Sequence, residues 1–137
     1  PDVIDEGFIR DFVDRYGEAR NSRDAEKVVA LCSKDMVYVD ASNPRKGQGR
    51  EVIRLLLLEL FRTVEDIGFQ VVGGPYLALD GRSAAARWLV TGTMKRASGS
   101  YADLEFETAE FYEFSEGLID HYTVVLRELT APRRARP

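Results

Sequence analysis

The sequence contains few of the residues that disulfides, metal centres and nucleic-acid contacts need. Cys32 is the single cysteine and His121 the single histidine, so no internal disulfide and no zinc-type ligand set can form. The formal net charge of -4 contrasts with the basic charge that is usual for nucleic-acid-binding domains. The leucine run at residues 55–58 is far too short to span a bilayer. The sequence therefore predicts a cytoplasmic protein with no metal site, no nucleic-acid partner and no membrane contact.

Size and composition favour one globular domain over residues 1–137. Hydrophobic residues make up 45% of the chain and charged residues 31%, as is typical of folded soluble proteins. A chain of this length buries roughly 68–70% of its unfolded surface, which is enough for a hydrophobic core. We expect a short lead at residues 1–4 and a disordered basic tail at residues 131–137, where Arg133, Arg134 and Arg136 lie between prolines.

Three segments show helical patterns. Residues 5–21 carry apolar side chains at helical spacing, with charged residues opposite them. Asp24 is a candidate N-cap for a second, short helix that ends near Leu31. Residues 49–64 have a broad apolar face, which indicates a third helix packed against a sheet.

The remaining apolar segments show strand patterns. The predicted strands are residues 36–41, 69–79 with a kink at Gly73-Gly74-Pro75, 83–95, 101–114 and 118–129. The order α-α-β-α-β-β-β-β indicates an α+β fold in which three N-terminal helices pack on a strongly curved antiparallel sheet, a cystatin-like cone. Such a sheet, covered by helices on its concave face, would leave a pocket open at one end.

The stretch from Met36 to Gly49 predicts one polar group at the mouth of this pocket. Alternation places Met36, Tyr38 and Asp40 on one face of the strand. Asp40 then either overlooks the cavity or caps the turn at residues 42–44. Both interpretations stay open at this point.

Two further polar residues fall in apolar patterns. Glu110 alternates with aromatic residues on the more apolar side of residues 105–114. If it faces the core, desolvation disfavours its charged form, and a neutral acid can donate a hydrogen bond; a bulge that turns it to solvent is the alternative. Tyr16 lies on the apolar face of the first helix, and its hydroxyl needs a partner, which could be an ordinary backbone carbonyl.

The same alternation predicts the walls of the pocket and the outer face of the sheet. We expect His121 to face away from the pocket, because it alternates with neighbours that face inward. Val125, Phe111 and Leu89 are candidates for a homodimer contact on the outer face, although scattered surface apolar residues are the alternative. The predicted substrate-binding residues are Tyr38, Trp88, Phe106, Thr108, Tyr112, Tyr122, Val124 and Leu126.

Several short motifs together resemble the ketosteroid isomerases and, more loosely, the wider fold family of nuclear transport factor two and the SnoaL-like polyketide cyclases. The matching motifs are Arg15-Tyr16, Asp24, Val39-Asp40, Gly49-Arg50-Glu51, residues 110–114 and Gly117-Leu118-Ile119. The interval from Asp40 to Gly49 fits the family without a gap. The chain differs in having Glu110 where the family usually has aspartate, and Ala41 where it often has proline.

This resemblance implies catalysis without a cofactor. Asp40 would act as the general base that removes a proton next to a carbonyl, and Tyr16 and Glu110 would donate hydrogen bonds to the enolate oxygen. It also implies a homodimer formed through the outer face of the sheet.

Three functions stay open from the sequence. The first is a small-molecule isomerase or cyclase, the latter closing a ring by an aldol step, with a hydrophobic carbonyl compound as its substrate. The second is a non-catalytic ligand-binding or accessory protein of a natural-product pathway. The third is a dimerisation module, in which Trp88, Phe106 and Tyr112 would fill the pocket.

Overall fold

The computed structural model describes residues 3–41 and 45–129. The predicted turn at residues 42–44 and the basic tail lie outside the described residues. The helices are α1 (Glu6–Asn21), α2 (Ala25–Val29) and α3 (Arg50–Thr63); the strands are β1 (Cys32–Asp40), β2 (Arg45–Gln48), β3 (Gly68–Leu77), β4 (Ser83–Lys95), β5 (Tyr101–Ser115) and β6 (Leu118–Glu128).

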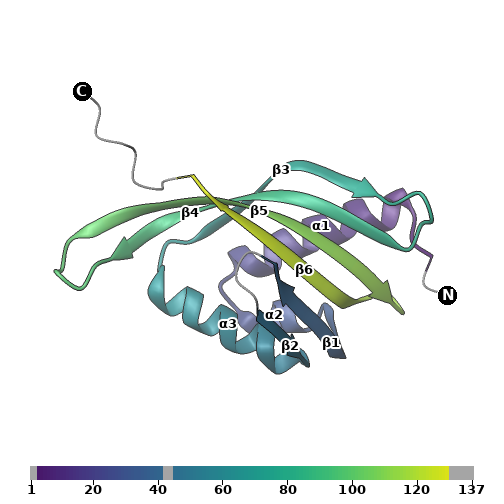
Figure 1. The fold of residues 1–137 in the computed structure, drawn as a ribbon, viewed down its shortest axis with the longest axis horizontal. Helices are drawn as coiled ribbons and strands as arrows, with labels where there is room; N and C mark the ends of the chain where they lie inside the picture. Colours follow the sequence, from purple (N-terminus) through teal and green to yellow (C-terminus); the bar gives the residue numbers. More distant parts are fainter. Residues whose placement is uncertain (1–2, 42–44, 130–137) are drawn as a thin grey trace.

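The strands form one six-stranded sheet in the order β2-β1-β6-β5-β4-β3. Figure 1 shows β3 to β6 as a bowed layer above α2 and α3. β1 runs parallel to β6, whereas every other neighbouring pair is antiparallel. The prediction of an α+β fold with three helices and a curved sheet is confirmed. The prediction of a wholly antiparallel sheet is wrong at β1 and β6.

β2 is the strand that the sequence pattern did not predict. It falls in the expected loop before α3 and pairs with β1, with Val37 opposite Gln48 and Asp40 opposite Arg45. Its four residues, Arg-Lys-Gly-Gln, show no apolar alternation, so only pairing with β1 makes this segment a strand. The expected β1 also begins four residues earlier than Met36, at Cys32, with a register shift between Cys32 and Val37.

Local signals in the sequence account for the helix ends. The Asp5 carboxylate accepts a hydrogen bond from the Phe8 amide at 2.8 Å and begins α1. Asp24 caps α2 in the same way, by accepting from the Glu26 amide. The lead segment also joins the fold, because the Ile4 amide donates to the Gly81 carbonyl and the Ile4 side chain is buried.

The core lies between α1 and the inner face of the sheet. Phe12 of α1 contacts the rings of Tyr112 and Phe114 edge-on, and Tyr16 contacts Trp88 in the same way. α1 approaches β4 closely at Gly17, where an added Cβ would lie 3.3 Å from the Trp88 ring. This half of the inner face is therefore filled by α1, and the other half lies opposite α3.

The outer face of the sheet keeps apolar side chains at its surface. Phe111 and Val125 are exposed and Leu89 is half-buried, and His121 lies on the face opposite to that of Tyr122. Among the described residues, no helix has both the length and the apolar character that crossing a membrane requires.

Candidate functional site

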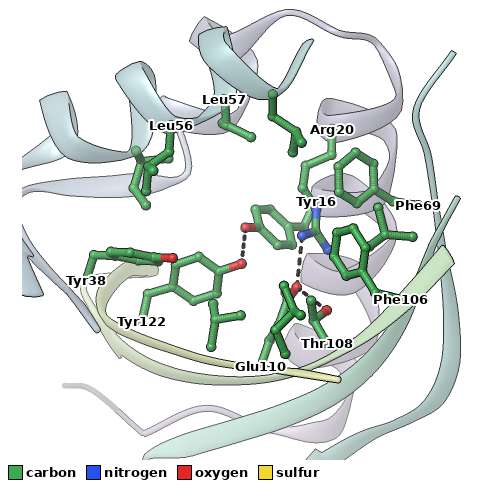
Figure 2. A pocket seen from close by; sticks show the side chains of 15 residues that line it. Tyr16, Arg20, Tyr38, Leu56, Leu57, Phe69, Phe106, Thr108, Glu110 and Tyr122 are labelled. Atoms are coloured by element: carbon green, nitrogen blue, oxygen red, sulfur yellow. Dashed lines mark hydrogen bonds and ion pairs between the residues drawn. The ribbon is translucent and has the colours of Figure 1, made fainter. Parts of the chain in front are cut away.

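A cavity of about 240 Å³ opens between α3 and the inner face of the sheet. Figure 2 shows Leu56 and Leu57 of α3 on one side and the polar side chains of α1 and the sheet opposite them. Its apolar walls come from Ile53, Leu56, Leu57, Leu60, Phe69, Val90, Phe106, Val124 and Leu126. Its polar groups are Tyr16, Arg20, Tyr38, Thr108, Glu110 and Tyr122. This volume lies below the ~300–1,000 Å³ of typical small-molecule pockets, so the cavity suits a compound of one or two rings.

The register of the sheet places Asp40 and Glu110 on the same inner face. Asp40 pairs with Val124 across β1 and β6, and Val124 pairs with Glu110 across β6 and β5. Directly paired residues point to the same side of a sheet, so the three form one row. The register shift in the β5–β6 pairing falls beyond this row, between Glu113 and Phe114. The alternative in which a bulge turns Glu110 to solvent is therefore wrong.

Glu110 is a carboxylate that accepts hydrogen bonds. It is 1% exposed, and Arg20 Nη1 donates to its Oε2 at 2.9 Å. Thr108 Oγ1 donates to the same oxygen at 2.7 Å, and Tyr112 Oη donates to Oε1 at 2.8 Å. Glu110 is the acceptor in all three contacts, and one of the donors is a cation. The resemblance implies that Glu110 donates a hydrogen bond to the substrate, and this role stays a prediction, which did not include Arg20.

Arg20 is the polar residue of the site that the sequence analysis missed. It follows Phe12 and Tyr16 at intervals of four residues, so helical periodicity places it on the apolar face of α1. It is 4% exposed, and its Cζ lies 4.1 Å from the ring centroid of Tyr16, 4.4 Å from that of Phe69 and 4.3 Å from that of Trp88. Burial opposes its charge, but Glu110 and the nearby phenols outweigh this effect and raise the pKa of Arg20.

A pair of tyrosines forms the second polar contact of the cavity. Tyr16 Oη donates to Tyr122 Oη at 2.6 Å, so the partner of Tyr16 is a side chain and not a backbone carbonyl. Burial, together with the nearby Glu110 charge, raises the pKa of both phenols. Both therefore stay protonated near neutral pH. The hydroxyl proton of Tyr122 is not used in this bond, which leaves Tyr122 able to donate to a group in the cavity.

Two predicted substrate-binding residues, Trp88 and Tyr112, lie beneath the cavity and do not line it. Trp88 is 1% exposed and Tyr112 0%. Trp88 Nε1 donates to Tyr112 Oη at 2.8 Å, and Tyr112 in turn donates to Glu110. They lie where α1 covers the sheet, so the prediction that they contact substrate is corrected, and in the part of the chain that the structure describes they do not fill the cavity.

The other predicted site residues line the cavity, with the exception of Asp40. Asp40 is half-buried at the end of β1, on the face of Tyr38, but it is not part of the cavity wall. Among the described residues, no three histidine, cysteine, aspartate or glutamate side chains lie close enough to bind a metal ion. The predicted residues that do line the cavity are Tyr16, Tyr38, Phe106, Thr108, Glu110, Tyr122, Val124 and Leu126.

Alkaline pH is expected to destabilise the protein through the two phenols. Their pKa is raised in the fold, whereas an unfolded tyrosine ionises near its ordinary pKa of about 10. Unfolding therefore releases protons above that pH, so this stabilisation is complete below about pH 10 and is lost as the pH rises towards the folded pKa. Urea unfolding over this range measures the loss, which we expect to be smaller in Tyr16→Phe. An equal loss of stability in Tyr16→Phe would show that ionisation of Tyr16 does not cause the alkaline destabilisation.

Comparison with known proteins gives a family and a fold. The family model for a SnoaL-like domain matches residues 13–122. The structure of SalBIII, an epoxide hydrolase/cyclase-like enzyme with a role in pyran ring formation in polyether salinomycin, aligns with a TM-score of 0.75 at 18% identity, over 92% of this chain and 95% of that one. No curated protein matches the sequence.

Two bacterial structures align over similar lengths. A putative ketosteroid isomerase from Kribbella flavida has a TM-score of 0.68 at 22% identity, over 95% of this chain and 85% of that one. A putative polyketide cyclase from Xanthomonas campestris has a TM-score of 0.68 at 18% identity, over 87% of this chain and 90% of that one. At these identities the likeness shows a shared fold.

Proposed function

This chain belongs to the family of SnoaL-like domains, and from that premise we propose that it is an isomerase or cyclase acting next to the carbonyl group of a small hydrophobic compound. The observation that carries the proposal is the bond from Tyr16 to Tyr122 at the wall of an apolar cavity. It presents a protonated phenol where water is largely excluded. A hydrogen bond to developing negative charge is strongest in such a setting.

The proposed chemistry uses side chains alone. Asp40 removes a proton from the carbon next to the carbonyl, the C–H electron pair forms a C=C bond, and the carbonyl π electrons move to oxygen. Tyr122 donates a hydrogen bond to that oxygen. Tyr16 donates to the hydroxyl oxygen of Tyr122, which makes the Tyr122 hydroxyl a stronger donor. An isomerase returns the proton to a different carbon. A cyclase uses the enolate carbon to attack a second carbonyl of the same molecule, the π electrons of that carbonyl move to its oxygen, and this oxygen takes the proton from Asp40.

The position of Asp40 supports its assignment as the base. Asp40 follows Tyr38 by two residues and lies on the same face of β1. Across the sheet it pairs with Val124, which in turn pairs with Glu110. A substrate that extends from the cavity past Tyr38 would lie against this end of β1. Glu110, whose oxygens already accept three hydrogen bonds, is the weaker candidate for a base.

Hydrogen exchange tests this proposal without knowledge of the natural substrate. The wild-type protein is incubated with 1-tetralone in D2O. Proton NMR then follows the loss of the signal from the hydrogens on the carbon next to the carbonyl. We expect exchange faster than in buffer that contains the same concentration of acetate. Binding of the ketone without faster exchange would instead favour a ligand-binding protein.

Tyr122→Phe is expected to slow this exchange by about 10²–10³-fold, the usual effect of removing one oxyanion donor. The phenyl ring keeps the packing of Tyr122 and removes only its hydroxyl. Tyr101→Phe is the matched control, because Tyr101 is exposed at the start of β5, away from the cavity wall, and its exchange rate should equal that of the wild type. Equal rates in both variants would exclude Tyr122 as the donor.

A further inference from the structure

Within residues 3–41 and 45–129, two of the three guanidinium nitrogens of Arg20 have no hydrogen-bond acceptor. Nη1 donates to Glu110, whereas Nε and Nη2 are buried and have no partner in this part of the chain. A buried donor without an acceptor costs about 1–3 kcal/mol, and more when the group is charged. Such groups are rare in folded proteins and call for an explanation. Arg20 lines the cavity, so an acceptor on a bound ligand can provide one.

The rings around Arg20 indicate how a ligand reaches these N–H groups. Tyr16 and Trp88 are each held in place by a hydrogen bond from their own polar atom, to Tyr122 and Tyr112 respectively. Phe69, the third ring against the guanidinium, lines the cavity and has no polar side-chain atom. Figure 2 shows Phe69 and Phe106 beside Arg20 on the side away from Tyr16. Phe69 is therefore the ring of the three that a ligand in the cavity can displace to reach the guanidinium.

The charges in the cavity favour a neutral ligand. Arg20 and Glu110 cancel each other, and Tyr16 and Tyr122 remain uncharged because their pKa is raised. An anionic ligand would add an uncompensated charge to an apolar cavity, at a high desolvation cost. A carbonyl oxygen accepts from Arg20 without adding charge. Enolate formation also leaves the total charge unchanged, because the proton moves to Asp40.

The two donor positions are separated by one phenol. The ring face of Tyr16 contacts Arg20, and the hydroxyl of Tyr16 contacts Tyr122. Oxygens on opposite sides of a six-membered ring are likewise separated by one ring.

We propose that Arg20 binds a second oxygen of the substrate, and that the substrate class is therefore neutral dicarbonyl compounds with one oxygen at Tyr122 and the other at Arg20. Glu110 is a positioning residue, since it holds Nη1 and so fixes the edge that carries Nε and Nη2. This inference rests on the proposed function, in that it assigns the second end of the same substrate.

A pair of ligands that differ by one oxygen tests the inference. Dissociation constants of trans-decalin-1,4-dione and trans-1-decalone are measured by calorimetry with the wild-type protein. We expect the dione to bind at least tenfold more tightly, because a hydrogen bond to a charged donor is worth about one to two powers of ten in affinity. Trp88, the single tryptophan, lies against Arg20, so its emission should shift with the dione. The anion trans-decalin-1-carboxylate should bind more weakly than either ketone.

Two variants separate ligand binding from structural support. The double variant Arg20→Met/Glu110→Gln removes both charges together and leaves neither one unpaired. Arg20→Lys keeps the ion pair but replaces the rigid guanidinium, which has three nitrogens, with one ammonium nitrogen that Glu110 partly engages. We expect the dione and the decalone to bind within about threefold of each other in the double variant, and the preference for the dione to fall below that of the wild type in Arg20→Lys, with circular dichroism verifying the fold. A purely structural role would weaken both ligands equally and preserve their ratio.

Each result decides the inference. Equal affinities in the wild-type protein, or a preference for the dione that persists in both variants, would overturn it. Deuterium exchange of the decalone is measured in parallel and reports on the proposed function alone. A preference for the dione that depends on Arg20, without exchange, would support the second oxygen site and contradict the proposed enzymatic function. Exchange without the preference would support the enzymatic function and contradict the second oxygen site.

Discussion

Arg20→Met alone is expected to destabilise the protein by about 3–5 kcal/mol, the usual effect of removing one partner of a buried ion pair. The substitution leaves the Glu110 carboxylate buried with donors only from Thr108 and Tyr112. Methionine fills part of the space between the aromatic rings, so the main cost is electrostatic. Urea unfolding followed by circular dichroism at neutral pH measures the change. Small domains have free energies of unfolding of about 5–15 kcal/mol, so this substitution would remove a large fraction of the stability.

Two controls isolate the buried charge. The double variant Arg20→Met/Glu110→Gln should recover most of the lost stability, because the glutamine carbonyl still accepts from Tyr112 or Thr108 and no charge remains. Arg10→Met breaks the exposed Arg10–Glu6 pair of the same helix and should change stability by less than about 1 kcal/mol. If Arg20→Met lowers the free energy of unfolding no more than Arg10→Met does, the buried Arg20–Glu110 pair contributes no more to stability than an exposed pair.

The parts of the fold that local pattern controls were predictable. β4 has its predicted bounds, Ser83–Lys95, because alternation and flanking turns both mark it. The predicted kink at residues 73–75 of β3 is confirmed by register shifts between Val71 and Tyr76. β2 and the parallel pairing of β1 with β6 depend on contacts between distant segments. Tyr38 pairs with Tyr122, 84 residues later, and no local pattern reports such a pairing.

The site divides in the same way. A two-residue period fixes which face a side chain takes, so the inward direction of Thr108, Glu110 and Tyr112 followed from the sequence. The period does not tell which part of that face α1 covers, and for this reason Tyr112 was assigned to the cavity wall. The ion pair of Glu110 is with Arg20, 90 residues away in the chain. Helical spacing could have identified Arg20 as buried, but not its partner.

Asp40→Asn is expected to slow deuterium exchange of a bound ketone by about 10²–10⁴-fold, the contribution of a positioned general base. Asparagine has the shape of aspartate but cannot take the proton under these conditions. Because Asp40 lies outside the cavity wall, the dissociation constant of the ketone should change by less than about twofold. The two measurements together separate loss of the base from loss of the site.

Asp35→Asn is the matched control for this prediction. Asp35 is an exposed carboxylate on the same strand as Asp40, so its removal changes the net charge equally and should leave exchange unchanged. If both variants slow exchange to a similar extent, a general electrostatic effect explains the loss. If Asp40→Asn keeps full exchange, the base lies elsewhere on the inner face. Among the described residues that line the cavity, the carboxylate is Glu110, and its use as a base would require Arg20 to release it during the reaction.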